Sequence, residues 1–231
     1  MRNFLALMGL IGLTACGGFR DDLAQAPDPL GTFRLGHNVV YVSEPVQGPF
    51  SRTVTDDEWQ AAVVTAVEDR LGEARYFGDK YFHVGVAVEG YVLAYPGVPL
   101  VYSPKSILIF SVNFFEDATQ TKLNDEAIQL TVFEPCCTIP LIGTGFTRSA
   151  EEQMEGLSFT AARAIERTMR QNADWFGGTP EILEADDTIL EGNVLIDNPE
   201  LVAPDQTPPE DIVALQDLTV ADPVVGPPSD N

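Results

Sequence analysis

The sequence predicts an α+β fold, a two-layer α/β sandwich in which two helices cover one face of a mainly antiparallel sheet in the order β-α-β-β-β-α. Two segments open with a capping box and continue with apolar residues at helical spacing. Three consecutive segments between these two helices, and one segment before them, are rich in β-branched and aromatic residues. Two helices on one face of a sheet is the simplest two-layer solution for this order.

The first predicted strand covers residues 33–42, and the first helix follows a loop punctuated by proline and glycine. Thr55 and Glu58 have the spacing of a capping box, in which the Thr55 hydroxyl accepts from the Glu58 amide and the Glu58 carboxylate reaches back. One helical face down to Leu71 is then apolar, and its members are Trp59, Ala62, Val63, Ala66, Val67 and Leu71.

Three further strands are predicted over residues 81–94, 106–116 and 127–134. The middle one is apolar nearly throughout, as expected of a central strand covered on both faces. The first alternates, which places two sets of side chains on opposite faces. Phe82, Val84, Val86, Val88 and Val92 form one set, and His83, Gly85, Ala87, Glu89, Tyr91 and Leu93 form the other.

The second helix is predicted from Ser149 to about Asn172, with Ser149 and Glu152 as its capping box. Its apolar residues repeat at spacings of three and four, and three arginines lie in its second half, where cations interact favourably with the helix dipole. The apolar positions are Met154, Leu157, Ala161, Ile165 and Met169, and the arginines are Arg163, Arg167 and Arg170.

Charge is distributed unevenly along the chain, whose formal net charge is −22. Residues 33–172 contain 18 acidic and 11 basic residues, whereas residues 173–231 contain 14 acidic residues and no Lys or Arg. Nucleic acids and anionic lipid surfaces attract proteins through Lys and Arg. The composition therefore argues against nucleic acid as a partner.

The first sixteen residues have the layout of a secretory signal peptide. Arg2 supplies a positive charge, residues 4–13 are uncharged and mostly apolar, and small residues follow. Ten residues are too few to cross a bilayer, which takes about 20. The segment Leu13-Thr14-Ala15-Cys16 resembles the lipobox of bacterial lipoproteins, although an ordinary signal peptide with an incidental Cys16 is the alternative.

The lipobox resemblance implies that Cys16 is lipidated and becomes the first residue of the mature chain. In that family the thiol receives a diacylglyceryl group and the new amino terminus is usually acylated, so that fatty acids such as palmitate anchor the protein in the membrane. Gly17, in place of the aspartate that commonly retains such proteins at the inner membrane, favours the outer membrane, facing the periplasm.

The predicted organisation has four parts: a lipoprotein signal peptide (residues 1–15), a lipidated flexible tether (16–32), the α+β domain (33–176) and a disordered tail (177–231). The tether contains two prolines and three aspartates without any period, and it would span roughly 20–25 Å as a coil. The tail contains eight prolines, 13 acidic residues and no basic residue, so it cannot readily collapse into a second core.

With Cys16 lipidated, two cysteines remain, Cys136 and Cys137. A disulfide between such neighbours would be strained, because Cα atoms about 3.8 Å apart lie below the usual range for bridged cysteines. Two reduced thiols with at least one packed against the sheet is the alternative. His37 and His83 are isolated in the sequence, and no metal site, cofactor or nucleotide motif is predicted.

Enzymatic activity is not predicted. Glu89 interrupts a valine-rich strand, but His83 is six residues away, roughly 20 Å along an extended chain, so these two side chains cannot form a dyad. A catalytic interpretation would need His83, Glu89 or Cys137 in a cleft. The element order is similar to that of small envelope lipoproteins, including auxiliary lipoproteins of lipid-transport ATPases and the amino-terminal domain of TolB.

Two functional hypotheses follow. The first is a non-enzymatic adaptor or assembly factor, anchored to the membrane by lipid and bound to an envelope protein partner. The second is an auxiliary subunit of an envelope transport system that binds lipid or another apolar ligand. In the second hypothesis aromatic and apolar residues line the sheet face that the helices leave uncovered, namely Tyr91, Leu93, Tyr95, Tyr102 and Phe133.

Overall fold

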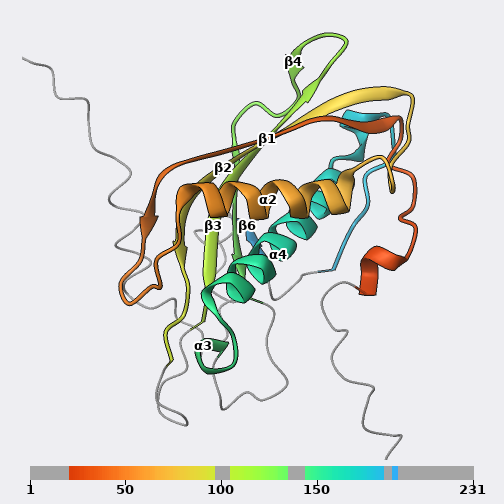
Figure 1. Ribbon diagram of the computed structural model, residues 1–231. Coiled ribbons are helices and arrows are strands. Elements are labelled where there is room, and N and C mark those ends of the chain that lie inside the picture. The colour runs from red at the N-terminus through yellow and green to blue at the C-terminus, as the bar shows by residue number, and fades with distance from the viewer. Residues whose placement is uncertain (1–20, 97–104, 135–143, 185–188, 192–231) are drawn as a thin grey trace, which may run out of the picture.

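The computed structural model describes residues 21–96, 105–134, 144–184 and 189–191. Helices α2 (Asp56–Leu71) and α4 (Ala150–Gln171) pack on one face of a sheet, as Figure 1 shows. The strands follow the order β1-β2-β3-β5-β6, with β4 paired to β3. Their bounds are β1 Phe33–Gln47, β2 Lys80–Val92, β3 Ile107–Glu116, β4 Thr121–Lys122, β5 Ile128–Phe133 and β6 Ile189–Glu191.

Three short helical segments complete the described residues: η1 (Asp21–Ala24), α3 (Thr144–Thr147) and η2 (Ala173–Phe176). The predicted α+β class and the order β-α-β-β-β-α are confirmed. Within the described ranges, each helix is either too short or too polar to span a bilayer.

The sheet is antiparallel except between β1 and β2, which pair in parallel. Parallel neighbours need a crossover long enough to return the chain to the starting edge, and α2 supplies it. The remaining pairs follow one another through shorter connections. The predicted mainly antiparallel sheet therefore contains one βαβ unit at its β1 edge.

Both predicted capping boxes are present. The Glu58 amide donates to the Thr55 hydroxyl at 3.3 Å, and the Thr55 amide donates to the Glu58 carboxylate at 2.7 Å. At the start of α4 the Glu152 amide donates to the Ser149 hydroxyl at 3.1 Å, and the Ser149 amide donates to the Glu152 carboxylate at 2.7 Å. Each box satisfies two donors that the helix itself leaves open.

The cap of α4 has a measurable effect on stability. Replacing Ser149 with alanine removes the acceptor for the Glu152 amide, so the free energy of unfolding should fall by about 1 kcal/mol. Urea unfolding monitored by circular dichroism measures this change. Ser149→Asp, which retains an acceptor, is the control; equal losses in both variants would contradict the capping explanation.

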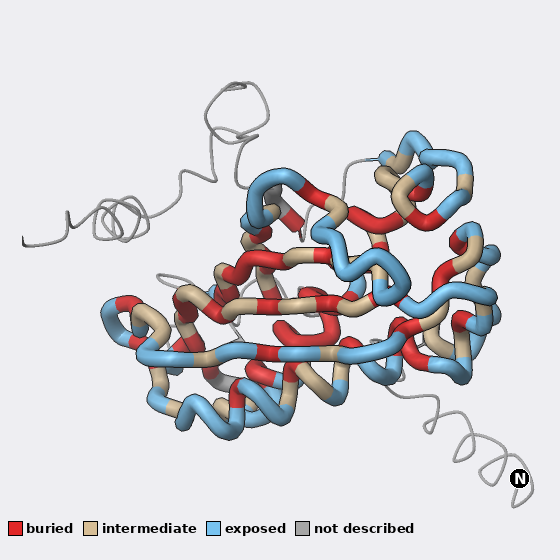
Figure 2. The backbone as a smooth tube through the Cα atoms, turned by 90° about the horizontal axis from the view of Figure 1, so that it is seen from above, coloured by how far each residue is buried: buried red, intermediate tan, exposed pale blue. Residues whose placement is uncertain are grey.

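The core lies between the sheet and the two helices, where buried segments of both layers face one another (Figure 2). Phe176 of η2 is 1% exposed and closes one end of this core. Its ring centroid lies 5.4 Å from that of Phe33, 5.1 Å from that of Phe82 and 5.9 Å from that of Phe114, in edge-to-face geometry. Residues from β1, β2, β3 and η2 therefore form one aromatic cluster.

Helix α2 also covers part of the outer edge of β1. The Gln60 side chain donates to the Val40 carbonyl at 2.9 Å, and the Glu44 amide donates to the Asp56 carboxylate at 3.2 Å. Edge strands present unpaired backbone groups that promote aggregation unless they are covered. These side chains occupy part of the edge that a further strand would otherwise use.

The structure extends the domain beyond both predicted boundaries. Residues 21–32, which we expected to be flexible, contain η1, and the Arg75 guanidinium donates to the carbonyls of Leu23 and Gln25 at 2.8 and 2.9 Å. Leu30 is 3% exposed. The flexible-tether prediction is therefore wrong for this part, because the segment satisfies an arginine and buries a leucine.

The predicted disordered tail likewise contributes to the domain. Strand β6 pairs antiparallel with β5 and extends the sheet, and Ile189 is buried in the core. The Glu181 amide donates to the Arg170 carbonyl at 3.0 Å. The predicted boundary after residue 176 is thus too early, because Ile189 and its neighbours in the acidic segment pair with the free edge of β5. Residues 192–231 lie outside the described residues.

Candidate functional site

The predicted apolar-ligand face is corrected at two of its five residues. Tyr91 is 4% exposed and Leu93 is fully buried on the helix side of the sheet, with the Tyr91 ring centroid 5.2 Å from that of Trp59. The cause is an irregularity in β2: Val88 pairs with Phe110, whereas Gly90 pairs with Ile109, so Glu89 is an extra residue. Such a bulge reverses the alternation that follows it.

The other predicted site residues are distributed as follows. Tyr95 is half exposed, and the Arg52 guanidinium lies over its ring at 5.9 Å. Phe133 at the end of β5 is partly buried. Three further sets of predictions, for lipidated Cys16, for Cys136 and Cys137, and for Tyr102, lie outside the described residues.

The two histidines, which are isolated in the sequence, are neighbours in the fold. The rings of His37 and His83 stack with centroids 4.8 Å apart, and the His37 amide donates to His83 Nδ1 at 2.9 Å. His83 Nε2 lies 3.0 Å from Asp117. The prediction of isolation is wrong because parallel pairing of β1 with β2 brings the two residues together. Both ring nitrogens of His83 are engaged, which leaves it poorly suited to bind a metal.

Glu89 occupies the bulge of β2 on the sheet face opposite the helices. Its carboxylate accepts a hydrogen bond from the Gln129 side chain of β5 at 2.5 Å. His83 instead contacts Asp117. The two residues that a catalytic interpretation would combine therefore have different partners, as their separation along the strand predicts.

In the described part of the chain, a cluster of charged side chains around Glu166 joins α2 and α4. The Arg70 guanidinium from α2 contacts one Glu166 oxygen at 2.7 Å, and the Tyr76 hydroxyl donates to the other at 2.5 Å. Arg75 and Arg170 approach that second oxygen to 3.7 and 3.8 Å. The side chains of Arg70 and Glu166 are only 3% and 10% exposed, so the pair is almost fully desolvated.

The environment of Tyr76 raises the pKa of its hydroxyl well above the ordinary value. Burial is the largest cause, followed by the charge of Glu166 and by the hydrogen bond that the Tyr76 hydroxyl donates to it. The Arg170 guanidinium donates to the same hydroxyl at 2.9 Å, which opposes the shift. Tyr76 is therefore held in the neutral form.

The free energy of unfolding should consequently fall as the pH rises into the alkaline range. Above about pH 10 the unfolded chain ionises Tyr76 while the folded chain keeps it protonated, so the free energy of unfolding falls with rising pH. The contribution of this group is at most about 1.4 kcal/mol per pH unit. Urea titrations between pH 9 and 11 measure the slope, which should be shallower in Tyr76→Phe; identical slopes would contradict the assignment.

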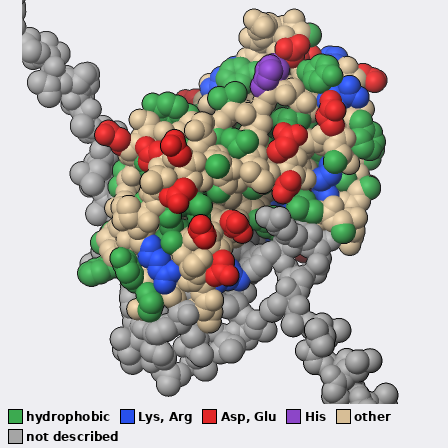
Figure 3. Space-filling model, in the orientation of Figure 1, with side chains coloured by type: hydrophobic (Ala, Val, Ile, Leu, Met, Phe, Trp, Pro, Cys, Tyr) green, Lys and Arg blue, Asp and Glu red, His purple; other side chains and the backbone are tan. Residues whose placement is uncertain are grey.

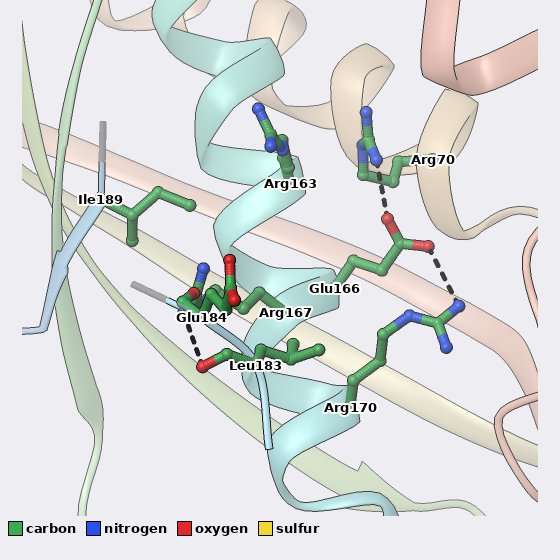
Figure 4. Close-up of a pocket in the computed structure, with 8 residues that line it drawn as sticks. All are labelled: Arg70, Arg163, Glu166, Arg167, Arg170, Leu183, Glu184 and Ile189. Atoms are coloured by element: carbon green, nitrogen blue, oxygen red, sulfur yellow. Dashed lines mark hydrogen bonds and ion pairs between the residues drawn. The ribbon is translucent and has the colours of Figure 1, made fainter. Parts of the chain in front are cut away.

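A pocket lies beside this network, between α4, the end of α2, residues 183–184 and the start of β6 (Figure 4). Its volume is about 300 Å³. Arg167 of α4 donates to the carbonyls of Leu183 and Glu184, which fixes the segment that forms one wall. We call this cavity the arginine pocket; its lining residues are Arg70, Arg163, Glu166, Arg167, Arg170, Leu183, Glu184 and Ile189.

Glu166 was not identified from the sequence as a site residue, although the pattern contains a signal for it. Glu166 lies one helical turn after Ala162 and two turns after Phe159, and all three are buried. The Arg70 guanidinium lies 4.8 Å from the Phe159 ring centroid and thus follows the same row of residues. A carboxylate that continues a buried row, with arginines three and four residues away, indicates a buried ion pair.

Comparison with models of protein families gave no match, and comparison with curated proteins gave none either. Among solved structures, the chain is similar to a protein of the DUF330 family from Xanthomonas campestris, at 12% identity and a TM-score of 0.37, covering 63% of this chain and 91% of that one.

Two further solved structures are similar at a comparable level. A candidate lipoprotein from Caulobacter crescentus matches at 13% identity and a TM-score of 0.33, over 62% of this chain and 93% of that one. A minor lipoprotein from Acinetobacter baumannii matches at 12% identity and a TM-score of 0.27, over 57% and 93%. Likeness at these TM-scores carries no conclusion about what this chain does.

Proposed function

We propose that the protein is a lipid-anchored lipoprotein of the bacterial envelope, held at the outer membrane and facing the periplasm, whose folded domain is a non-enzymatic adaptor for a protein partner. The observation that carries the proposal is the segment Leu13-Thr14-Ala15-Cys16 directly after an apolar run of signal-peptide length. Acyl chains on Cys16 would supply an anchor of about 0.8 kcal/mol for each buried CH₂.

The arrangement of the domain supports the adaptor part of the proposal. Helices α2 and α4 cover one sheet face (Figure 1). In β1 the exposed Val39 and Tyr41 flank the buried Val40, so the alternation of the strand directs them away from the helices. These two side chains of β1 are 60% and 65% exposed. The buried charges around Glu166 are engaged with one another, as expected of a group that holds two helices together.

The anchor is tested by replacing Cys16 with serine. Serine cannot form the thioether, so the protein should be lost from the membrane fraction, and its amino-terminal peptide should lack acyl chains. Cell fractionation and mass spectrometry of that peptide are the measurements. The double variant Cys136→Ser/Cys137→Ser should keep both the anchor and the location. An unmodified thiol in the native chain would refute the proposal.

The adaptor role requires a protein neighbour in the cell. A photoreactive amino acid at position 41, on the sheet face that the helices leave open, should yield a defined protein adduct. The matched probe at position 65, an exposed site on α2, should not. Mass spectrometry identifies the adducts. Recovery of no protein above background from position 41, or the same set from both positions, would count against an adaptor that uses this face.

A further inference from the structure

Two exposed apolar side chains lie next to the contacts that attach the amino-terminal segment, residues 21–32, to the rest of the domain. Phe77 is 69% exposed, and Ile182 is fully exposed. Over the described part of the face that Figure 3 shows, hydrophobic side chains occur in separate groups interspersed with acidic ones. Single exposed apolar residues are common on protein surfaces, so exposure alone does not indicate a binding site.

Phe77 is held directly against the amino-terminal segment. Two residues before it, the Arg75 guanidinium donates to two carbonyls of residues 23–25, at 2.8 and 2.9 Å. One residue after it, the backbone passes so close to the segment that a Cβ on Gly78 would lie 2.2 Å from the Thr32 carbonyl. The backbone on both sides of Phe77 is therefore fixed, while its ring remains open to solvent.

Ile182 is likewise next to a contact with the amino-terminal segment. The Arg170 guanidinium donates to the Asp28 carbonyl at 3.2 Å and contacts the Glu181 carboxylate at 3.1 Å. The Glu181 amide donates to the Arg170 carbonyl at 3.0 Å, and the Leu183 carbonyl accepts from a second arginine of α4 at 3.5 Å. Residues on both sides of Ile182 are thus bonded to α4, and its side chain points into solvent.

The amino-terminal segment leads back to the proposed lipid anchor. Only residues 17–22 separate Cys16 from Leu23, so under the proposed lipidation the attached end of the domain lies close to the bilayer. Figure 1 shows η1 and the connection between α2 and β2 at this end, where β1 begins. Strand β1 has 15 residues and is roughly 45 Å long, and the exposed Phe50 follows its far end.

We propose that Phe77 and Ile182 insert into the interfacial region of the bilayer, so that the end of the domain that holds the amino-terminal segment rests on the lipid surface. An apolar side chain that moves from water to the boundary of the acyl chains is stabilised by the hydrophobic effect. Because the backbone beside both residues is already fixed, little conformational entropy is lost on insertion. The inference rests on the proposed lipid anchor and adds the orientation of the domain to it.

The charges at this end of the domain favour a zwitterionic lipid surface. The Lys80 ammonium is paired with the Glu116 carboxylate at 3.0 Å, and Glu73 and Asp79 interact electrostatically with Arg34. Basic and acidic side chains are therefore mixed, and attraction to anionic headgroups, which takes clustered Lys and Arg, is not required for the contact. Phosphatidylcholine is accordingly a sufficient test surface.

A polarity-sensitive fluorophore tests the insertion in the lipidated protein. A nitrobenzoxadiazole probe is attached to Phe77→Cys or to Ile182→Cys, each in the Cys136→Ser/Cys137→Ser background, because the Cys16 thiol is blocked by its acyl group. After reconstitution into phosphatidylcholine vesicles, the emission at both positions should shift to shorter wavelength and be quenched by lipids that carry a nitroxide on the acyl chain. In the chain probed at position 182, Phe77→Ser should reduce the quenching, because one of the two inserted side chains is lost.

The matched control is Phe50→Cys, which places the same probe at an exposed phenylalanine beyond the far end of β1. Its emission should remain that of a probe in water. Flotation of the vesicles separates this inference from the proposed function: a chain that does not float with them contradicts the anchor, and the insertion with it. A chain that floats while the probes at positions 77 and 182 stay in water overturns the insertion alone, as does equal quenching at positions 50, 77 and 182.

Discussion

Replacing Glu166 with alanine should lower the free energy of unfolding by about 3–5 kcal/mol, the usual cost of removing one partner from a buried ion pair. Arg70 would lose the carboxylate that it contacts at 2.7 Å, and the Tyr76 hydroxyl would lose its acceptor. Water cannot readily replace either, because the Arg70 side chain is 3% exposed. Guanidinium chloride unfolding at pH 7 measures the loss.

A second substitution separates charge from hydrogen bonding at this position. Glu166→Gln retains an acceptor for Tyr76 but removes the negative charge that faces Arg70, so its loss should be intermediate. Glu116→Ala, which disrupts the exposed pair with Lys80 at 3.0 Å, is the control and should cause a far smaller loss. Comparable losses in the Glu116 and Glu166 variants would contradict the assignment of Glu166 as the centre of the network.

Replacing Phe176 with alanine should also cost about 3–5 kcal/mol of unfolding free energy. The side chain is 1% exposed and contacts aromatic rings from β1, β2 and β3, so its removal would open a cavity in the core. Because η2, which ends at Phe176, begins two residues after α4 ends, the loss should include the packing that fixes the end of this helix. Thermal and urea unfolding are the measurements.

The matched control for Phe176 is another phenylalanine of the same domain. Phe77 is 69% exposed in the connection between α2 and β2, and its replacement by alanine should change stability by no more than about 0.5 kcal/mol. If Phe176→Ala lowered the free energy of unfolding as little as Phe77→Ala does, the stability of the domain would not depend on η2. In that case the position of Phe176 in the core would have to be revised.

Local patterns in the sequence were sufficient to predict the helices. Thr55 with Glu58, and Ser149 with Glu152, place each helix start correctly, because a capping box depends only on two residues three positions apart. Apolar alternation placed β2 and β5, and a nearly continuous apolar run placed β3, each within two residues of the observed bounds. Fold class followed from these elements and their order.

Features that depend on pairing between distant residues were missed. The extra residue at Glu89 reverses the faces of Tyr91 and Leu93, and only the register against Phe110 and Ile109 reveals it. His37 and His83 meet because β1 and β2 pair in parallel, which the sequence does not specify. The arginine pocket similarly requires α2, α4, residues 183–184 and β6 to be placed together.

The contacts of Arg75 with Leu23 and Gln25 set how far the domain can stand from an anchoring membrane. Under the proposed lipidation, seven residue steps separate Cys16 from Leu23, and a fully extended chain covers at most about 25 Å over that length. The Arg170 guanidinium, which lines the arginine pocket, donates to the Asp28 carbonyl at 3.2 Å. The amino-terminal segment that follows the anchor therefore contacts the domain next to this pocket. The end of the domain that contains the arginine pocket would therefore lie closest to the bilayer. A partner would then have to bind within a short distance of the membrane surface.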